Sequence, residues 1–438
     1  MKLYSTNNTS LRVDFPDAVF NSLPQDNGLY MPVQIKPLDA KFLDKIDQYS
    51  LPEIAFEIAK NLLQDAMPEN ELRRIVNEAF NFPVPLIQLD KNTFALELFH
   101  GPSLAFKDFG ARFMSRIMGY FLKKDEQMLD ILVATSGDTG GAVAAGFYMV
   151  PNTRVTILYP KGKVSDIQKM QLTTNGENIH AVEVEGTFDD CQALVKLAFL
   201  DQGLKQRFRF TSANSINIAR LIPQTFYYFN AYAQLKAKGM TNLVFSVPSG
   251  NFGNVAAGLL AFKMGLPVTQ FLAATNINDT VPSFLKTGIY TPKPSVQTYS
   301  NAMDVGNPSN WVRIMDLFKE DPDQLKVILK GYSFSDEQTL DAINRIFETY
   351  NYVTCPHTAI GWLAANQWRD ENQLSNAAMI FLSTAHPCKF PDVIPAQVKK
   401  VMVSPEQVIK LKASENKFDS ISSDFSEFKN YLLEKYSS

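Results

Sequence analysis

The chain has few of the residues that build disulfide frameworks and metal sites: three cysteines and four histidines in 438 residues. Cys191, Cys355 and Cys388 are widely spaced, odd in number and form no CxxC pair. This spacing argues against a disulfide framework and against a structural zinc site, so we expect no metal. Free thiols are typical of a reducing compartment, and the expected location is the cytoplasm.

Long apolar runs and an excess of one charge are also absent. No stretch approaches the roughly eighteen apolar residues of a spanning helix, and the opening MKLYSTNNTSLRVDF has no apolar core of a signal peptide. Neither secretion nor membrane insertion is expected. The 42 basic and 45 acidic residues leave a formal net charge of -3. We therefore expect no nucleic-acid partner and no membrane partner.

The length exceeds that of a usual single domain and predicts several parts. Residues 1–94 contain helical patterns such as 52–63, whose apolar residues recur at three- and four-residue steps, and are interpreted as a mainly helical N-terminal domain. Residues 95–400 form the predicted catalytic region. Residues 401–438 are richer in lysine, glutamate and serine and are interpreted as surface helices.

Strand patterns alternate with helix patterns through the predicted catalytic region. This alternation is typical of a parallel sheet covered by helices on both faces, and so of the α/β class. Most of the predicted strands are continuous apolar runs, as expected for strands that are buried on both sides. The predicted strands are 93–99, 131–134, 155–159, 243–247, 271–274 and 379–382.

Lys107 has an unusual position for a lysine, between Leu104, Ala105 and Phe106 on one side and Phe109 on the other. Partial desolvation of its ammonium group favours the neutral amine, which is a nucleophile able to form a Schiff base. The alternative is a lysine that lays its stem on the surface and keeps its charge in water. Apolar residues at helical spacing follow, so the lysine is expected at the start of an inward-packing helix.

Two glycine-rich segments each follow a predicted strand: the first glycine loop, residues 135–140, and the second glycine loop, residues 249–254. Glycines let the backbone approach a ligand, and the amides of a following helix favour an anion. Two anion pockets on one sheet are therefore indicated. The alternative is that both are only tight turns. Neither segment fits GxGxxG or GxxxxGK[ST], which disfavours nicotinamide cofactors and ATP.

Two further polar clusters are candidates. Asn214, Asn217 and Arg220 are three apart and could present amides and a guanidinium to a phosphate, although Asn and Ser are also favoured as helix caps. Ser383 and Thr384 follow a predicted strand and offer hydroxyl groups without a carboxylate.

In combination these motifs resemble those of the threonine synthases, a family of pyridoxal-phosphate enzymes of fold type II. The resemblance runs through LYMP, ELFHGPSLAFKDFG, ATSGDTG, SANSINIARL, VPSGNFGN, ATNINDTVP, SNAMDV and STAHP, in this order. It implies two open lobes with parallel-type sheets flanked by helices, together with the helical N-terminal domain.

The resemblance also implies a role for each candidate residue. Lys107 would bind the aldehyde of pyridoxal 5'-phosphate and later move protons. Asp138 would approach the 3-hydroxyl of the cofactor, where many fold type II enzymes carry an asparagine. Ser383 or Thr384 would face its pyridine nitrogen. The cofactor phosphate would be held by backbone amides of Gly250, Asn251, Phe252, Gly253 and Asn254. The substrate carboxylate would be held by Thr135, Ser136, Gly137 and Thr139, and the substrate phosphate by Asn214, Ser215 and Arg220.

The implied reaction converts O-phospho-L-homoserine and water to L-threonine and phosphate, by γ-elimination and β-addition of water. This is a lyase reaction and the last step of threonine biosynthesis. No obligate protein partner is indicated. A serine or threonine dehydratase, or another β-replacement enzyme on the same fold, is the alternative enzyme. A catalytically silent binding protein is the alternative from another class.

Overall fold

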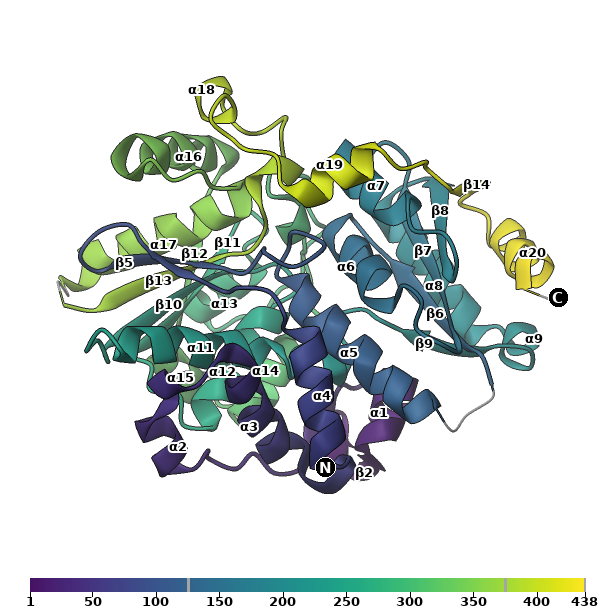
Figure 1. Ribbon diagram of the computed structural model, residues 1–438, viewed down its shortest axis with the longest axis horizontal. Helices are drawn as coiled ribbons and strands as arrows, with labels where there is room; N and C mark the ends of the chain where they lie inside the picture. The colour runs from purple at the N-terminus through teal and green to yellow at the C-terminus, as the bar shows by residue number, and fades with distance from the viewer. Residues whose placement is uncertain (124–126, 374–375, 437–438) are drawn as a thin grey trace.

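The computed structural model describes residues 1–123, 127–373 and 376–436. Two lobes, each built on a largely parallel sheet, lie side by side, and the N-terminal helices lie beneath both (Figure 1). The first glycine loop follows a strand of one sheet and the second glycine loop a strand of the other. The prediction of two anion pockets on one sheet is therefore wrong, because a linear alternation of strands and helices does not reveal which strands share a sheet.

The larger sheet has the order β12-β11-β10-β13-β5-β4, and only β4 is antiparallel to its neighbour. Helix α17 (Pro356–Asn372) covers one face, and α11 (Gln224–Lys236) and α12 (Gly253–Lys263) cover the other (Figure 1). The strands are β4 (Leu86–Gln88), β5 (Thr93–Glu97), β10 (Leu243–Pro248), β11 (Gln270–Thr275), β12 (Leu329–Ser333) and β13 (Ala378–Ser383). The other helices of this part of the chain are α13 (Thr280–Thr287), α14 (Trp311–Leu317), α15 (Pro322–Ile328) and α16 (Asp336–Tyr350).

The smaller sheet has the order β14-β8-β7-β6-β9, and all of its pairs are parallel. Alternate residues of β6 belong to different hydrophobic clusters. Ile131 lies in the same cluster as Val143 of α6, whereas Leu132 lies in the same cluster as Leu194 of α8. Both faces are thus buried, which explains the continuous apolar runs. The elements are β6 (Leu129–Ala134), α6 (Asp138–Phe147), β7 (Thr153–Pro160), α7 (Asp166–Thr173), β8 (Ile179–Glu185), α8 (Phe188–Leu200), α9 (Gln202–Lys205), β9 (Arg209–Ser212) and α10 (Ile218–Leu221).

The N-terminal part is mainly helical and also contains a small antiparallel sheet of order β2-β1-β3, which the sequence patterns did not predict. A capping box, in which the side chains of Ser50 and Glu53 each bond the backbone of the other, begins α3. Helix α3 packs on α11, and α4 packs on α5 (Lys107–Leu122). The elements are β1 (Lys2–Ser5), β2 (Asn8–Asp14), α1 (Phe15–Asn21), β3 (Tyr30–Pro32), α2 (Ala40–Asp44), α3 (Leu51–Leu63) and α4 (Glu69–Ala79).

The C-terminal segment is more than surface helices. After α18 (Ala396–Lys399) and α19 (Glu406–Lys412), strand β14 (Asp419–Ser422) pairs with β8. Helix α20 (Phe425–Tyr436) then buries three of its side chains against the same lobe, namely Phe428, Leu432 and Tyr436. The chain thus returns to the smaller sheet at its end. The domain boundaries at residues 94 and 400 stay predictions, and residues 437–438 of the last range lie outside the described part.

None of the helices in residues 1–123, 127–373 and 376–436 has the length and apolar character needed to cross a lipid bilayer.

Candidate active site

The candidate residues follow the carboxyl ends of five strands, β5, β6, β9, β10 and β13. In open parallel sheets the carboxyl ends of neighbouring strands lie at one edge, where ligands bind. Residues 98–106, here called the lysine loop, connect β5 to α5. The loop is held against the end of β13, since the Leu98 amide donates to the Ser383 carbonyl (2.9 Å) and the Phe106 amide donates to the Thr384 carbonyl (2.8 Å). Lys107 therefore begins its helix beside the hydroxyl residues.

Lys107 is half-buried and is the first residue of α5. Burial lowers the pKa of its ammonium group from the ordinary 10.5 to about 8; the charge of Asp138 opposes this shift, and those of Arg220 and Lys389 add to it. An amine with this pKa is partly neutral at physiological pH, as nucleophilic attack on an aldehyde requires. The half-buried position and the lowered pKa favour the nucleophile over the surface alternative for this lysine.

The first glycine loop is folded by its own threonine. The Thr135 hydroxyl accepts hydrogen bonds from the amides of Gly137 (3.0 Å) and Gly140 (2.8 Å). Gly137 has φ 132°, and a Cβ there would meet the Gln168 side chain at 2.4 Å. No other residue type fits this position. Ser136 and Thr139 remain half-buried at the start of α6, where helix amides favour an anion.

Asp138 begins α6 and is buried in contact with two donors. Lys389 Nζ lies 2.7 Å from Asp138 Oδ1, and Gln168 Nε2 donates to the same oxygen at 3.0 Å. Burial alone would raise the pKa of Asp138, but the charges of Lys389 and Lys107, together with these hydrogen bonds, hold it well below its usual range. The side chain is thus a carboxylate, and its charge is matched by a lysine ammonium.

The second glycine loop is closed by side chains of its own. Asn254 accepts from the Ser249 hydroxyl (2.5 Å) and donates to the Pro248 carbonyl (2.9 Å). Phe252 has φ 58° and precedes the first turn of α12. Since the Asn254 side chain is used within the turn, the backbone amides at the start of α12 are the groups suited to a phosphate.

The second glycine loop and the segment after β9 are in direct contact. Asn251 Nδ2 donates to the Ser215 hydroxyl at 2.7 Å. Arg220 is buried and donates to the Ala213 carbonyl, and its Nε has no partner among the residues that the structure describes. Burial lowers the pKa of Arg220 to about 10, so the guanidinium stays charged at neutral pH. Asn217, by contrast, is fully buried and caps α10 through the Ala219 amide, which confirms the capping alternative for this residue.

Ser383 and Thr384 lie in a group of hydroxyl and thiol residues. The Tyr352 hydroxyl lies 3.3 Å from Ser383 Oγ, and the Thr358 hydroxyl lies 3.4 Å from it. Cys355 Sγ lies 3.1 Å from the same Thr358 hydroxyl. Burial raises the pKa of Cys355, so this group is neutral. A pyridine nitrogen here would meet hydroxyl groups, one of which, that of Tyr352, donates in turn to the Glu97 carboxylate at 2.9 Å.

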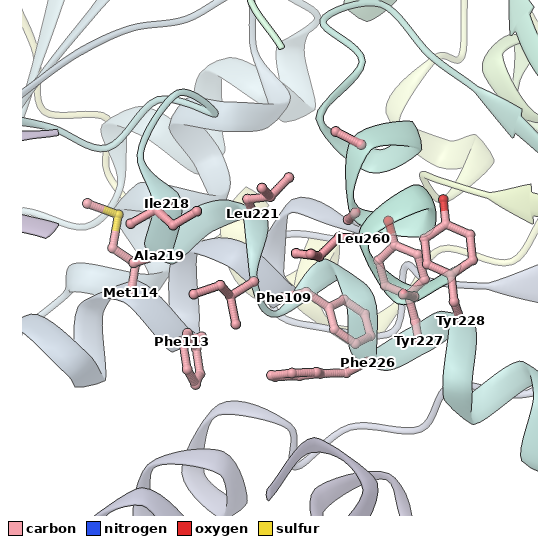
Figure 2. Packing of buried hydrophobic residues seen from close by; sticks show 14 of the residues in the cluster. Phe109, Phe113, Met114, Ile218, Ala219, Leu221, Phe226, Tyr227, Tyr228 and Leu260 are labelled. Atoms are coloured by element: carbon pink, nitrogen blue, oxygen red, sulfur yellow. The ribbon is translucent and has the colours of Figure 1, made fainter. Parts of the chain in front are cut away.

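The helices that begin at the site share one apolar core (Figure 2). Helix α10 packs between α5 and α12, and a Cβ on Gly110 of α5 would meet Arg220 Nε of α10 at 2.5 Å. Helix α5 and helix α10 are thus closely packed where Gly110 meets Arg220, next to the site. The residues that join the helices there include Phe109, Phe113, Met114, Ile218, Leu221, Phe226, Tyr227 and Leu260.

Among the residues at the site that were not predicted from the sequence are Lys389, Gln168 and Arg313, together with Tyr352 and Thr358 beside Ser383. Arg313 is fully buried and donates to the carbonyls of Ile216 (2.6 Å) and Ser215 (3.4 Å), which fixes the turn before α10. Apolar neighbours along the chain could have revealed the two buried cations, Lys389 and Arg313. Lys389, for example, stands between Cys388 and Phe390, much as Lys107 stands among phenylalanines. Nothing in the sequence distinguishes Gln168 from an ordinary capping-box residue.

The residues fit pyridoxal 5'-phosphate on three observations. Lys107 provides an amine of lowered pKa, α12 begins with amides behind a glycine loop, and the buried charges of Arg220 and Arg313 favour anions. Residues 80–384 match the family described as "Pyridoxal-phosphate dependent enzyme". The fold and the site thus define a pyridoxal-phosphate-dependent enzyme.

The flanking regions narrow this class further. Residues 2–80 match "Threonine synthase N terminus", and residues 358–432 match "Threonine synthase, C-terminal". The chain is 43% identical to the threonine synthase of Buchnera aphidicola from Acyrthosiphon pisum, over 99% of this chain and 100% of that one. It superposes on the structure of threonine synthase from Escherichia coli with a TM-score of 0.91 and 40% identity, covering 99% of this chain and 100% of the other. A PLP-bound threonine synthase from Brucella melitensis superposes with a TM-score of 0.92 and 33% identity over 100% of both chains. The chain belongs to the threonine synthase family.

Proposed function

We propose that the enzyme converts O-phospho-L-homoserine and water to L-threonine and phosphate. The observation that supports this most is the contact between two anion-binding segments, in which Asn251 of the second glycine loop bonds Ser215 beside the buried Arg220. One segment suits the cofactor phosphate. The other offers the buried and charged guanidinium of Arg220, with which a phosphate on the substrate would pair. Serine and threonine carry no such phosphate, so a dehydratase would have no use for this cation.

Each group of residues has a separate task in this reaction. The amides at the start of α6, with Ser136 and Thr139, hold the substrate carboxylate. Arg220 and Ser215, with Asn214, hold the substrate phosphate and stabilise its charge as it leaves. Ser383 or Thr384 would face the pyridine nitrogen, and a hydroxyl there would leave this nitrogen less protonated than a carboxylate would. Asp138 would be the residue toward the cofactor 3-hydroxyl, and the amides of residues 250–254 would hold the cofactor phosphate.

Lys107 carries the proton transfers. When bound, pyridoxal 5'-phosphate supplies the electron sink for negative charge on the reacting carbons. Released from the aldehyde, the Lys107 amine takes protons from the substrate carbons and returns them. Its lowered pKa matches this work, because a base with a pKa near the operating pH both accepts and donates readily.

The experiment compares the holoenzyme with Lys107→Ala and Arg220→Met. For the wild type we expect one threonine per phosphate released from O-phosphohomoserine, and for Lys107→Ala the loss of both products and of the visible cofactor band. Arg220→Met removes a charge-assisted contact worth roughly 1.5–3 kcal/mol, so KM should rise about ten- to a hundredfold. Arg74→Met, which removes a half-exposed surface arginine, is the matched control. Ammonia and keto acid formed from serine or threonine without any phosphate dependence would favour the dehydratase, and an intact chain with neither activity would favour the silent binding protein.

We further propose a role in amino-acid biosynthesis in the cytoplasm. Cys191, Cys355 and Cys388 are all free and buried, which accords with a reducing compartment.

A further inference from the structure

A buried ion pair joins the two lobes next to Lys107. Lys389, in the turn after β13 of the larger sheet, reaches Asp138 at the start of α6, beside the smaller sheet. The lysine side chain has no exposed surface, and that of Asp138 is 5% exposed. Charges so deeply buried are rare unless they are paired. Each therefore depends on the other.

Lys389 also fixes the loop that carries the nucleophile. Its ammonium donates to the Ser103 carbonyl at 2.9 Å, and the Ser103 amide donates to Asp108 Oδ2 at 2.9 Å. Asp108 is the residue after Lys107. One lysine side chain thus connects the lysine loop, the start of α6 and the turn after β13.

Asp138 would repel the substrate carboxylate if its own charge were not neutralised by Lys389. The amides at the start of α6 are those proposed to hold the substrate carboxylate, and Asp138 places a second carboxylate on the same turn. Two neighbouring carboxylates repel each other in a site shielded from water. Gln168, the other partner of Asp138, carries no charge, so only Lys389 neutralises this carboxylate by direct contact in the described part of the chain.

We propose that Lys389 is a positioning residue that neutralises Asp138, so that the start of α6 accepts the substrate carboxylate while Asp138 stays directed at the cofactor. This proposal deepens the proposed function and rests on it for the identity of the substrate. Lys389 and Asp138 act as one unit: removing either leaves the other charge buried without a partner. Removing both leaves neither charge without its partner, and asparagine retains the shape of Asp138 and its capacity to accept a hydrogen bond.

The test is a double-mutant cycle of Lys389→Met, Asp138→Asn and the combined variant, with Lys389→Arg as the conservative change. We expect Lys389→Met to raise the KM for O-phosphohomoserine at least tenfold and to shift the pH dependence of the visible cofactor band. Asp138→Asn alone should weaken pyridoxal-phosphate binding at least tenfold. The combined variant should recover to within about threefold of the wild type in KM and cofactor Kd, and Lys389→Arg should recover in part.

Lys429→Met is the matched control, because Lys429 also pairs with an aspartate, Asp201, at 2.7 Å but far from the site in a half-exposed position. It should leave KM, the cofactor Kd and the band unchanged. Two outcomes would overturn the proposal: a combined variant whose losses are the sum of those of the single variants, or a Lys389→Met enzyme that loses only thermal stability. The cofactor Kd and the visible cofactor band are measured without substrate. If the wild type releases no phosphate, the proposed function is contradicted, but the coupling between Lys389 and Asp138 can still be measured.

Discussion

At the scale of single residues, the site depends on lowering the proton affinity of one lysine. Lys107 faces apolar neighbours along the chain and two cations, Arg220 and Lys389, across the fold. Burial has the largest effect on its pKa, and the nearby cations add to it. The carboxylate of Asp138 acts against the effects of burial and of the cations on this pKa, but does not cancel them. The same set of charges that favours anionic ligands therefore also lowers the pKa of the lysine proposed as the nucleophile.

The pH dependence of cofactor attachment tests this electrostatic balance. Only the neutral amine attacks an aldehyde, and its fraction rises with pH through the pKa of the folded chain. With that pKa at about 8 in place of 10.5, attachment of pyridoxal phosphate to the apoprotein should reach half its maximal rate near pH 8. The rate is measured from the growth of the visible band after mixing. A midpoint close to 10.5 would contradict the desolvated position of Lys107.

At the scale of elements, two strand-to-helix junctions have similar glycine loops but leave different groups available to a ligand. The junction before α6 is folded by the Thr135 hydroxyl and leaves Ser136 and Thr139 available to a ligand. The junction before α12 is folded by Asn254 and leaves only the helix amides available. The first loop therefore suits a carboxylate that also accepts from hydroxyl groups, and the second suits a phosphate held by the backbone.

Substitution of Gly250 tests the second junction. A Cβ there would meet Met303 Cα at 2.7 Å and the Ala302 carbonyl oxygen at 2.8 Å, both of which belong to the backbone. Overpacking of this kind costs about 1–3 kcal/mol, so Gly250→Ala should weaken pyridoxal-phosphate binding by about five- to a hundredfold. The Kd is measured by titrating the apoprotein with cofactor. Gly119→Ala is the control, since its Cβ would meet only a Val150 methyl group at 3.3 Å, and its Kd should equal that of the wild type.

At the scale of the whole molecule, the chain crosses between the lobes more than once. It builds most of the smaller sheet between residues 129 and 212, completes the larger sheet by residue 383, and then returns to add β14 and α20 to the smaller sheet. The Tyr436 hydroxyl lies 2.7 Å from the Thr156 hydroxyl of β7, and the Arg154 guanidinium lies 3.7 Å from the centre of the Tyr436 ring. The C-terminal helix is therefore part of the core of the lobe that carries the first glycine loop.

The contribution of this helix can be measured as stability. Leu432 is fully buried in the cluster beneath α20, so Leu432→Ala should lower the free energy of unfolding by about 2–5 kcal/mol. The measurement is the shift of the urea unfolding midpoint. Leu200→Ala removes the same atoms from a neighbouring leucine that is 59% exposed, and should shift the midpoint little. Equal shifts for the two variants would mean that α20 does not stabilise the lobe.

Sequence patterns predicted the elements that bury long apolar runs. The runs at 131–134, 155–159, 243–247, 271–274 and 379–382 are strands in the structure, and the helix that begins at Lys107 was also expected. Strands such as β12 and β14 were missed, because they are short, partly polar and lie at sheet edges. A strand of this kind is stabilised by its neighbour and carries little pattern of its own.

The sequence by itself determined which residues could do chemistry: a lysine among apolar neighbours, two glycine loops after strands, and hydroxyls at the end of another strand. These are local properties, set by periodicity and by the conformations that each residue type allows. Tertiary structure alone decided which of them meet. It placed the two glycine loops on different sheets. It also brought Asn251 into contact with Ser215 and Lys389 into contact with Asp138, although these residues are far apart in the chain. Such contacts leave no periodic trace, because they depend on how the sheets pack and not on the spacing of neighbouring residues.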